Sequence, residues 1–159
     1  LDISAARMAR VTENLMRCGL SAETVAADAK DWEGGPFDAV LLDAPCSATG
    51  TIRRHPDLPH AKAARDLAPL LALQSVLIDR AVALTRPGYC TCSLWPEEGE
   101  AQVTAALARH PELSLDLGAL GLPGVDPAWI GAEGLRTRPD YWPGIGGLDG
   151  FFIAAFRRR

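Results

Sequence analysis

The chain of 159 residues has only four cysteines and three histidines, and these low counts exclude several classes of protein. Its four cysteines are too few for a disulfide-rich secreted scaffold, so we expect reduced thiols. Cys90 and Cys92 form a CxC pair without a matching second pair, and the three histidines are scattered, so we predict no metal site. Because no secretory signal and no apolar run of about 18 residues occur, we also predict no membrane partner and a cytoplasmic location.

Positive charge is not in excess either, because 16 lysines and arginines face 20 acidic residues and the formal net charge is −4. A protein that coats nucleic acid needs clustered lysine and arginine, so the overall charge excludes that role. A few short basic runs remain, and each suits either a phosphate contact or a solvated face. They are Arg53-Arg54-His55, Arg136 with Arg138, and Arg157-Arg158-Arg159.

The length and a hydrophobic content of 48% suit a single domain over residues 1–159. The first residues, Leu1-Asp2-Ile3, resemble the end of a strand. We therefore expect this domain to be part of a larger one, whose N-terminal strands precede the chain.

Apolar periodicity predicts strands that alternate with helices. The helix after Ser4 carries Cys18 on its apolar stripe, which predicts a core position for that thiol, and the apolar run 37–42 is typical of a strand buried on both faces. The predicted helices are 4–19, 66–84 and 96–110, and the predicted strands are 24–27, 37–42, 89–94, 113–117 and 151–156. This order predicts an α/β doubly wound domain, which binds ligands beyond the carboxyl ends of its strands.

Five chemically capable side chains fall at those strand ends: Asp2, Asp28, Asp43, Cys46 and Cys92. Acids at successive strand ends, here Asp2 and Asp28, can bind a nucleoside through ribose hydroxyls and a base amine, although helix caps give the same spacing. Cysteine suits attack on an electron-poor ring carbon. The alternative, two small hydrophobes filling a sheet end, fits poorly with the polar and turn-forming residues around Cys46.

At these residues the chain resembles the Sun (Fmu) family of S-adenosylmethionine-dependent RNA 5-methylcytosine methyltransferases. Three motifs in the family's order and at about its spacing carry the resemblance: Asp43-Ala44-Pro45-Cys46-Ser47, Thr91-Cys92-Ser93-Leu94 with Pro96-Glu97-Glu98, and Asp149-Gly150-Phe151-Phe152. Further similarity at Asp2-Ile3-Ser4, Asp28-Ala29 and 52–57 extends it over nearly the whole chain. It implies a Rossmann-like class I methyltransferase sheet, mostly parallel, with an antiparallel C-terminal strand.

The resemblance also implies a role for each site residue. Cys92 attacks carbon 6 of a cytosine in RNA, and carbon 5 then takes the methyl group of S-adenosylmethionine. Cys46 is linked to elimination and RNA release, and Asp43 helps to stabilise or protonate the ring and lies near the cofactor. Asp2 and Asp28 hold the cofactor's ribose and adenine. Further implied contacts are with RNA, made by Arg53 and Arg54 and, with less support, by Arg136.

Three departures from the family pattern accompany the resemblance. The family's glycine-rich cofactor loop would precede Asp2, Gly88 meets Tyr89 without the usual apolar residues between them, and Ala48 stands where glycine is more usual. Ribosomal RNA is the expected substrate by family analogy. Two alternatives remain open, a DNA cytosine methyltransferase and a non-catalytic RNA-binding or assembly factor with the same fold.

Overall fold

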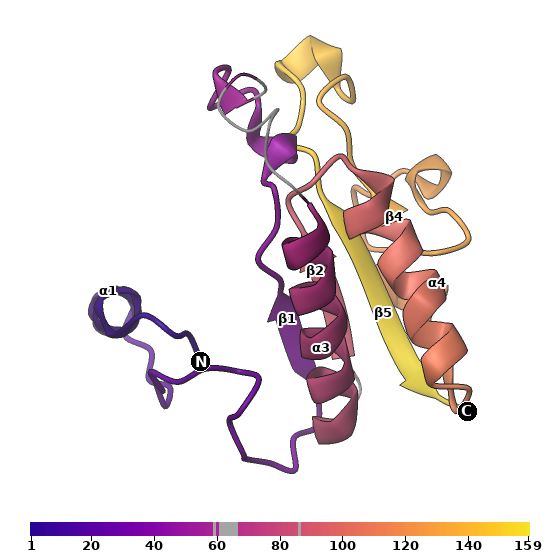
Figure 1. The fold of residues 1–159 in the computed structure, drawn as a ribbon. Coiled ribbons are helices and arrows are strands. Elements are labelled where there is room, and N and C mark those ends of the chain that lie inside the picture. Colours follow the sequence, from indigo (N-terminus) through magenta and orange to yellow (C-terminus); the bar gives the residue numbers. More distant parts are fainter. Residues whose placement is uncertain (59, 61–66, 86) are drawn as a thin grey trace. The chain divides into compact units, whose positions relative to one another are not determined.

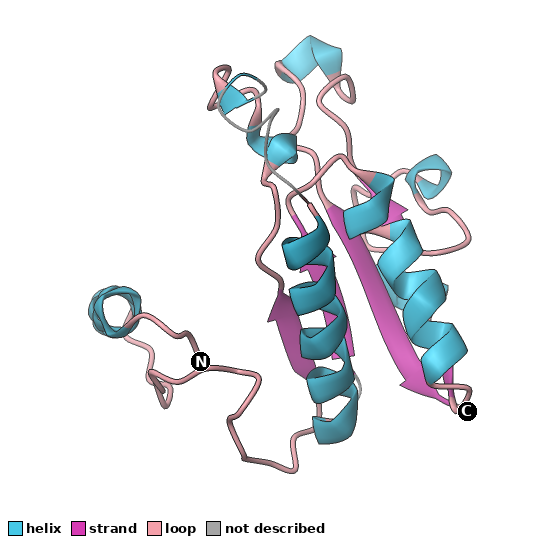
Figure 2. Ribbon diagram, in the orientation of Figure 1, coloured by secondary structure: helices cyan, strands magenta, loops and turns pink. Residues whose placement is uncertain are grey.

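A computed structural model describes residues 1–58, 60, 67–85 and 87–159. The chain divides into two compact units, residues 1–35 and 36–159, and each is described by itself. Figure 1 shows the course of the chain and Figure 2 its helices and strands. The assignment of residues 1–159 to one partial catalytic domain stays a prediction.

The first unit consists of one helix and an extended segment. Helix α1 (Ala5–Arg17) begins at Ser4, whose hydroxyl accepts from the backbone N–H of Arg7, as the sequence predicts. The predicted strand 24–27 is wrong in extent, because it is reduced to a single parallel bridge between Asp2 and Ala26. The core position predicted for Cys18 is also wrong, since the thiol is exposed and α1 has no buried residue.

The second unit is a mixed sheet whose first two strands are parallel. Its strands are β1 (Val40–Asp43), β2 (Pro87–Thr91), β3 (Leu113–Leu115), β4 (Leu135–Arg136) and β5 (Phe152–Arg158). Their order is β1-β2-β5-β3, and β4 also pairs with β5. β5 runs antiparallel to each of its partners, which confirms the predicted α/β class with an antiparallel C-terminal strand.

Strand β2 is continuous through the short Gly88-Tyr89 junction. Gly88 lies opposite Leu41 on β1 and Ala155 on β5, and Tyr89 follows in register opposite Leu42 and Ala154. The direct junction therefore leaves the ladder intact, and the strand ends one residue before Cys92. Burial of β1 on both faces is not observed, because Leu41 is 75% exposed.

Two helices cover one face of this sheet in Figure 1, α3 (Ala68–Leu84) and α4 (Glu100–Arg109). Position 66, where the sequence predicts the first of them to begin, lies outside the described residues. The second is predicted from Pro96, but a 3-10 turn, η2 (Pro96–Glu98), precedes it and α4 starts at Glu100. The helices and strands share a core that includes Ile78, Val103, Leu113, Tyr89 and Phe152. Among the described residues, no helix has both the length and the apolar character needed to cross a membrane.

Candidate functional site

The two predicted cysteines meet beyond the carboxyl ends of β1 and β2. Cys46 follows β1 by three residues and Cys92 immediately follows β2. Because these strands are parallel neighbours, their carboxyl ends lie side by side. The two sulfur atoms are 3.5 Å apart, and both residues are half-buried. The pair therefore forms a contact between two thiols that are 46 positions apart in the sequence.

The environment keeps the proton on Cys46. The hydrogen bond with Cys92, and then burial, raise the pKa of the Cys46 thiol far above its ordinary value. A third thiol nearby, Cys90, contacts Oδ1 of Asp43 at 3.7 Å. Burial, with the negative charge of Asp43 as a second cause, raises the pKa of Cys90 to about 11. Neither Cys46 nor Cys90 is thus a thiolate at neutral pH, whereas Asp43 lies exposed at the end of β1.

A buried glutamate contacts the two loops that carry the cysteines. These are residues 44–48, the Cys46 loop, and residues 92–95, the Cys92 loop. Glu98 is fully buried, and its carboxylate accepts from the backbone N–H of Ser47 at 2.9 Å and from the Ser47 hydroxyl at 2.5 Å. It also accepts from the Ser93 hydroxyl at 2.6 Å and from Nε2 of Gln74 at 3.0 Å. Ser47 follows Cys46, and Ser93 follows Cys92. One carboxylate therefore joins the residues next to both cysteines.

The Asp149-Gly150 motif contacts the segment after Cys46 through two glycines, Gly150 and Gly50. The backbone N–H of Gly50 donates to Cys92 O at 2.9 Å, and that of Gly150 donates to Gly50 O at 2.8 Å. A Cβ atom on Gly50 would lie 1.9 Å from Gly150 O, so no larger residue fits there without a shift. Ala48 adopts the left-handed conformation with φ 59°, which explains why glycine is more usual at this position.

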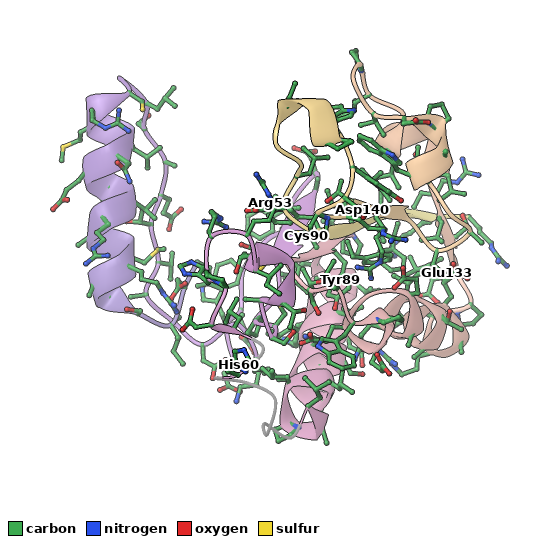
Figure 3. All side chains as sticks on the ribbon, turned by 90° about the horizontal axis from the view of Figure 1, so that it is seen from above. Arg53, His60, Tyr89, Cys90, Glu133 and Asp140 are labelled. Atoms are coloured by element: carbon green, nitrogen blue, oxygen red, sulfur yellow. The ribbon has the colours of Figure 1, made fainter. Side chains whose placement is uncertain are left out.

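Two of the predicted RNA-binding arginines lie on the segment that follows the Cys46 loop. Nε of Arg54 donates to Asp149 at 2.8 Å, and Arg53 lies 3.9 Å from the same carboxylate and donates to Gly146 O. Both guanidinium groups stay exposed. Figure 3 looks down on the molecule from above and labels Arg53 together with Tyr89 and Cys90. The pair is tied to the Asp149 motif yet accessible to solvent.

Arg136 has a different setting from the other two arginines. Its guanidinium donates two bonds of 2.6 Å to Glu100 and one of 2.8 Å to the Ser93 carbonyl, and it lies 5.1 Å from the Phe152 ring centroid. Burial raises the pKa of Glu100, but the hydrogen bonds and charge of Arg136, together with a backbone N–H bond, outweigh it and the net shift is downward. Arg136 thus binds the backbone at Ser93, next to Cys92. Its contact with RNA stays a prediction.

The two predicted cofactor acids belong to the first unit, whereas Asp43 belongs to the second. The Ser4 backbone N–H, and then Arg7, lower the pKa of Asp2. The Lys30 backbone N–H likewise lowers the pKa of Asp28. Both side chains are therefore ionised acceptors, and Asp2 sits on the parallel bridge to Ala26. Such carboxylates fit the hydroxyl and amine donors of a nucleoside. In the described part of the chain, no group of three acid, histidine or cysteine side chains could hold a metal.

Sequence reasoning missed the role of Glu98. The sequence predicts a helix from Pro96, and the helix dipole alone accounts for a glutamate in its first turn. The available signal was its position six residues after Cys92 in a turn that opens with proline. Gln74 was missed as well, because it lies on the largely apolar helix α3.

Comparisons with known proteins identify a family and several relatives. A family model described as 16S rRNA methyltransferase RsmB/F matches residues 1–157. Ribosomal RNA small subunit methyltransferase B of Vibrio vulnificus is 41% identical over 162 residues, which cover 97% of this chain and 35% of the relative. The chain thus spans about a third of the length of the curated relatives it matches.

Solved structures share the fold. The crystal structure of NSun6 from Pyrococcus horikoshii with SFG, an analogue of S-adenosylmethionine, has a TM-score of 0.75 and 26% identity. It covers 98% of this chain and 39% of its own. A methyltransferase homologue from the same organism has a TM-score of 0.69 and 27% identity over 99% of this chain and 52% of its own.

Proposed function

The chain belongs to the RsmB/F family of 16S rRNA methyltransferases, and from this premise we propose that it forms part of the catalytic domain of such an enzyme. The reaction transfers a methyl group from S-adenosylmethionine to carbon 5 of a cytosine in ribosomal RNA. It passes through a covalent bond between a cysteine and the base. The single observation that carries the proposal is the 3.5 Å contact between the sulfurs of Cys46 and Cys92.

The thiol pair supports a division of roles. The contact joins two sulfurs that could each react, and the resemblance to the Sun family assigns the nucleophile to Cys92, the residue that directly follows β2. Its thiolate bonds to carbon 6 of cytosine, and the displaced electron pair makes carbon 5 nucleophilic. After methylation, loss of the carbon 5 proton and departure of the Cys92 sulfur restore the aromatic ring. Cys46 can hydrogen-bond to that departing sulfur, which suits the release role.

S-adenosylmethionine supplies an electrophilic methyl group when it is bound. Asp2 and Asp28 would bind its ribose and adenine, because each is an ionised acceptor at the end of a strand-like segment. Asp43 is exposed at the end of β1 and contacts the Cys90 thiol, and it would stabilise or protonate the cytosine ring.

The RNA must present its cytosine out of a helix, because a thiol cannot reach carbon 6 within a base stack. Arg53 and Arg54 lie on the segment after the Cys46 loop and keep their guanidinium groups exposed, so they suit contacts with the backbone phosphates. When the target cytosine lies next to Cys46 and Cys92, the phosphates on either side of it would lie within reach of Arg53 and Arg54.

The test is methyl transfer to 16S rRNA, measured as 5-methylcytosine after digestion to nucleosides. We expect the wild-type protein to form this nucleoside and Cys92→Ala to form none. Cys18→Ala is the matched control, because it removes an exposed thiol from the other unit and should leave the rate unchanged. Wild-type product levels from Cys92→Ala would overturn the nucleophile assignment.

The cofactor assignment needs a separate binding measurement. Titration of S-adenosylmethionine by calorimetry should show affinity weakened at least about tenfold in Asp2→Ala and Asp28→Ala, because each loses a charged hydrogen bond worth about 1.5–3 kcal/mol. Unchanged affinity in both variants would contradict the assignment.

A further inference from the structure

We propose that Glu98 is a positioning residue whose buried carboxylate sets the distance between the Cys46 and Cys92 sulfurs. The inference deepens the proposed function and rests on it, because the distance matters only if the two thiols act on one base. It assigns a role to a side chain whose hydrogen bonds go to the residues that follow the two cysteines. Its evidence is the set of bonds that converge on the two carboxylate oxygens.

The bonds of Glu98 fall into two kinds. Oε1 accepts from the Ser47 backbone N–H and from Nε2 of Gln74, and both of these groups can only donate. Oε2 accepts from the hydroxyls of Ser47 and Ser93, which can donate or accept. The two serines also lie within 3.1 Å of each other through their oxygens. The carboxylate therefore fixes the residue after each cysteine relative to the other.

Gln74 adds a third anchor to the same loop. Its Nε2 donates both to Glu98 and, at 2.9 Å, to the carbonyl of Pro45, the residue before Cys46. Its Oε1 is buried and has no hydrogen-bond partner among the described residues. Such an unpaired acceptor is costly, and turning the amide over would set that oxygen against Glu98 and Pro45 oxygens instead. The Cys46 loop is thus held on both sides of the cysteine, at Pro45 by Gln74 and at Ser47 by Glu98.

The backbone of Glu98 is held as firmly as its side chain. Its carbonyl accepts from the Tyr89 hydroxyl at 2.7 Å and from the Thr91 hydroxyl at 3.3 Å, and both donors are buried on β2. These two bonds fix the backbone of Glu98, and with it the carboxylate, relative to the sheet. Since a misplacement of about 1 Å can lower a rate about 100-fold, loosening this anchor should affect the chemical step.

Two substitutions of Glu98 distinguish the effect of its hydrogen bonds from the effect of its negative charge. Glu98→Gln keeps an oxygen for the two obligatory donors, and its amide can donate to the serine hydroxyls, which then reverse their bonds. Glu98→Ala removes the acceptor that the Ser47 N–H and the Gln74 amide share, and Gln74 keeps only its bond to the Pro45 carbonyl. Glu97→Ala is the matched control, because Glu97 is exposed and adjacent in the same turn.

The experiment measures steady-state methyl transfer to RNA and, independently, capture of the thiol pair by phenylarsine oxide. This trivalent arsenical bonds two thiols together only when they are adjacent, and peptide mass analysis identifies the bridged cysteines. For Glu98→Ala we expect kcat to fall about 100-fold with KM for RNA within threefold of wild type. Bridging of Cys46 to Cys92 should slow in parallel. We expect Glu98→Gln to retain kcat within tenfold and to bridge normally, and Glu97→Ala to match wild type.

Each outcome bears on the inference. Wild-type kcat and bridging in Glu98→Ala would overturn it, as would a Glu98→Gln variant that is inactive while it bridges normally, because charge rather than position would then matter. If Glu98→Ala does not fold, Ser93→Ala replaces it, since it removes one bond next to Cys92 and should lower kcat and bridging less severely. A wild-type protein without methyl transfer, whose bridging still depends on Glu98, would refute the proposed function and leave the positioning role intact.

Discussion

Replacing Arg136 with methionine should destabilise the protein by about 2–3 kcal/mol. The methionine keeps an apolar stem against Phe152 and removes the guanidinium, which lies 5.1 Å from that ring. The variant loses two bonds of 2.6 Å to Glu100 and one of 2.8 Å to the Ser93 carbonyl. It therefore isolates what the charged group contributes.

The magnitude follows from the burial of the pair. Removing one partner of a fully buried ion pair costs about 3–5 kcal/mol, whereas an exposed pair contributes about 0–1 kcal/mol. The Arg136 side chain is 18% exposed and that of Glu100 is 31% exposed, so the pair falls between these limits. Loss of the bond to Ser93 O adds to the cost of losing the ion pair. The total loss in the free energy of unfolding is therefore about 2–3 kcal/mol.

Urea unfolding at pH 7 and at pH 3.5 measures the effect and its origin. The pKa of Glu100 is lowered in the folded state. A lowered carboxyl pKa contributes stability that is present above the unfolded value, about 4.3, and is lost as the pH falls through the folded value. The difference between wild type and Arg136→Met should therefore be largest at pH 7 and shrink at pH 3.5.

An opposite result would assign Arg136 to RNA instead. If the free energy of unfolding changes by less than about 0.5 kcal/mol while affinity for RNA falls, the guanidinium acts on phosphate rather than on the Ser93 segment. A difference that persists undiminished at pH 3.5 would exclude the ionised Glu100 as the cause.

Further predictions concern the loop next to the thiols. Ala48→Gly should raise the free energy of unfolding by about 0.5–1 kcal/mol, because glycine relieves the φ of 59°; a lower melting temperature would contradict this. Gly50→Ala should cost about 3 kcal/mol or more in chemical unfolding through the 1.9 Å approach to Gly150 O, whereas Gly144→Ala, with open space around it, should be nearly neutral. Alkylation of Cys90, followed by mass spectrometry, should still accelerate between pH 9 and 10, and a plateau by pH 9 would contradict its pKa of about 11.

The meeting of Cys46 and Cys92 could be predicted from the sequence because it depends on topology alone. Two predicted strands separated by a helix indicate parallel neighbours, and the residues after them then share one edge of the sheet. Local signals also sufficed for α1, where the Ser4 cap and the apolar spacing act within a few residues. These features need no knowledge of side-chain packing.

The supports of the thiol pair could not be predicted in the same way. Glu98 and Arg136 carry charges that ordinarily face solvent, and only the approach of the Cys46 loop, α3 and β4 turns them inward. The strand expected at 24–27 depends likewise on pairing partners rather than on its own residues, and the structure forms one bridge there. Sequence patterns thus indicated that the two thiols lie at one edge of the sheet, and tertiary contacts determined what holds them.

Trapping of the covalent intermediate tests the central claim most directly. Cys46→Ala protein incubated with 16S rRNA and S-adenosylmethionine should accumulate a protein–RNA adduct that survives denaturation, and mass analysis should place the bond on Cys92. Cys92→Ala should form none. An adduct in Cys92→Ala but not in Cys46→Ala would contradict the account, because Cys46 would then be the nucleophile, as in DNA cytosine methyltransferases.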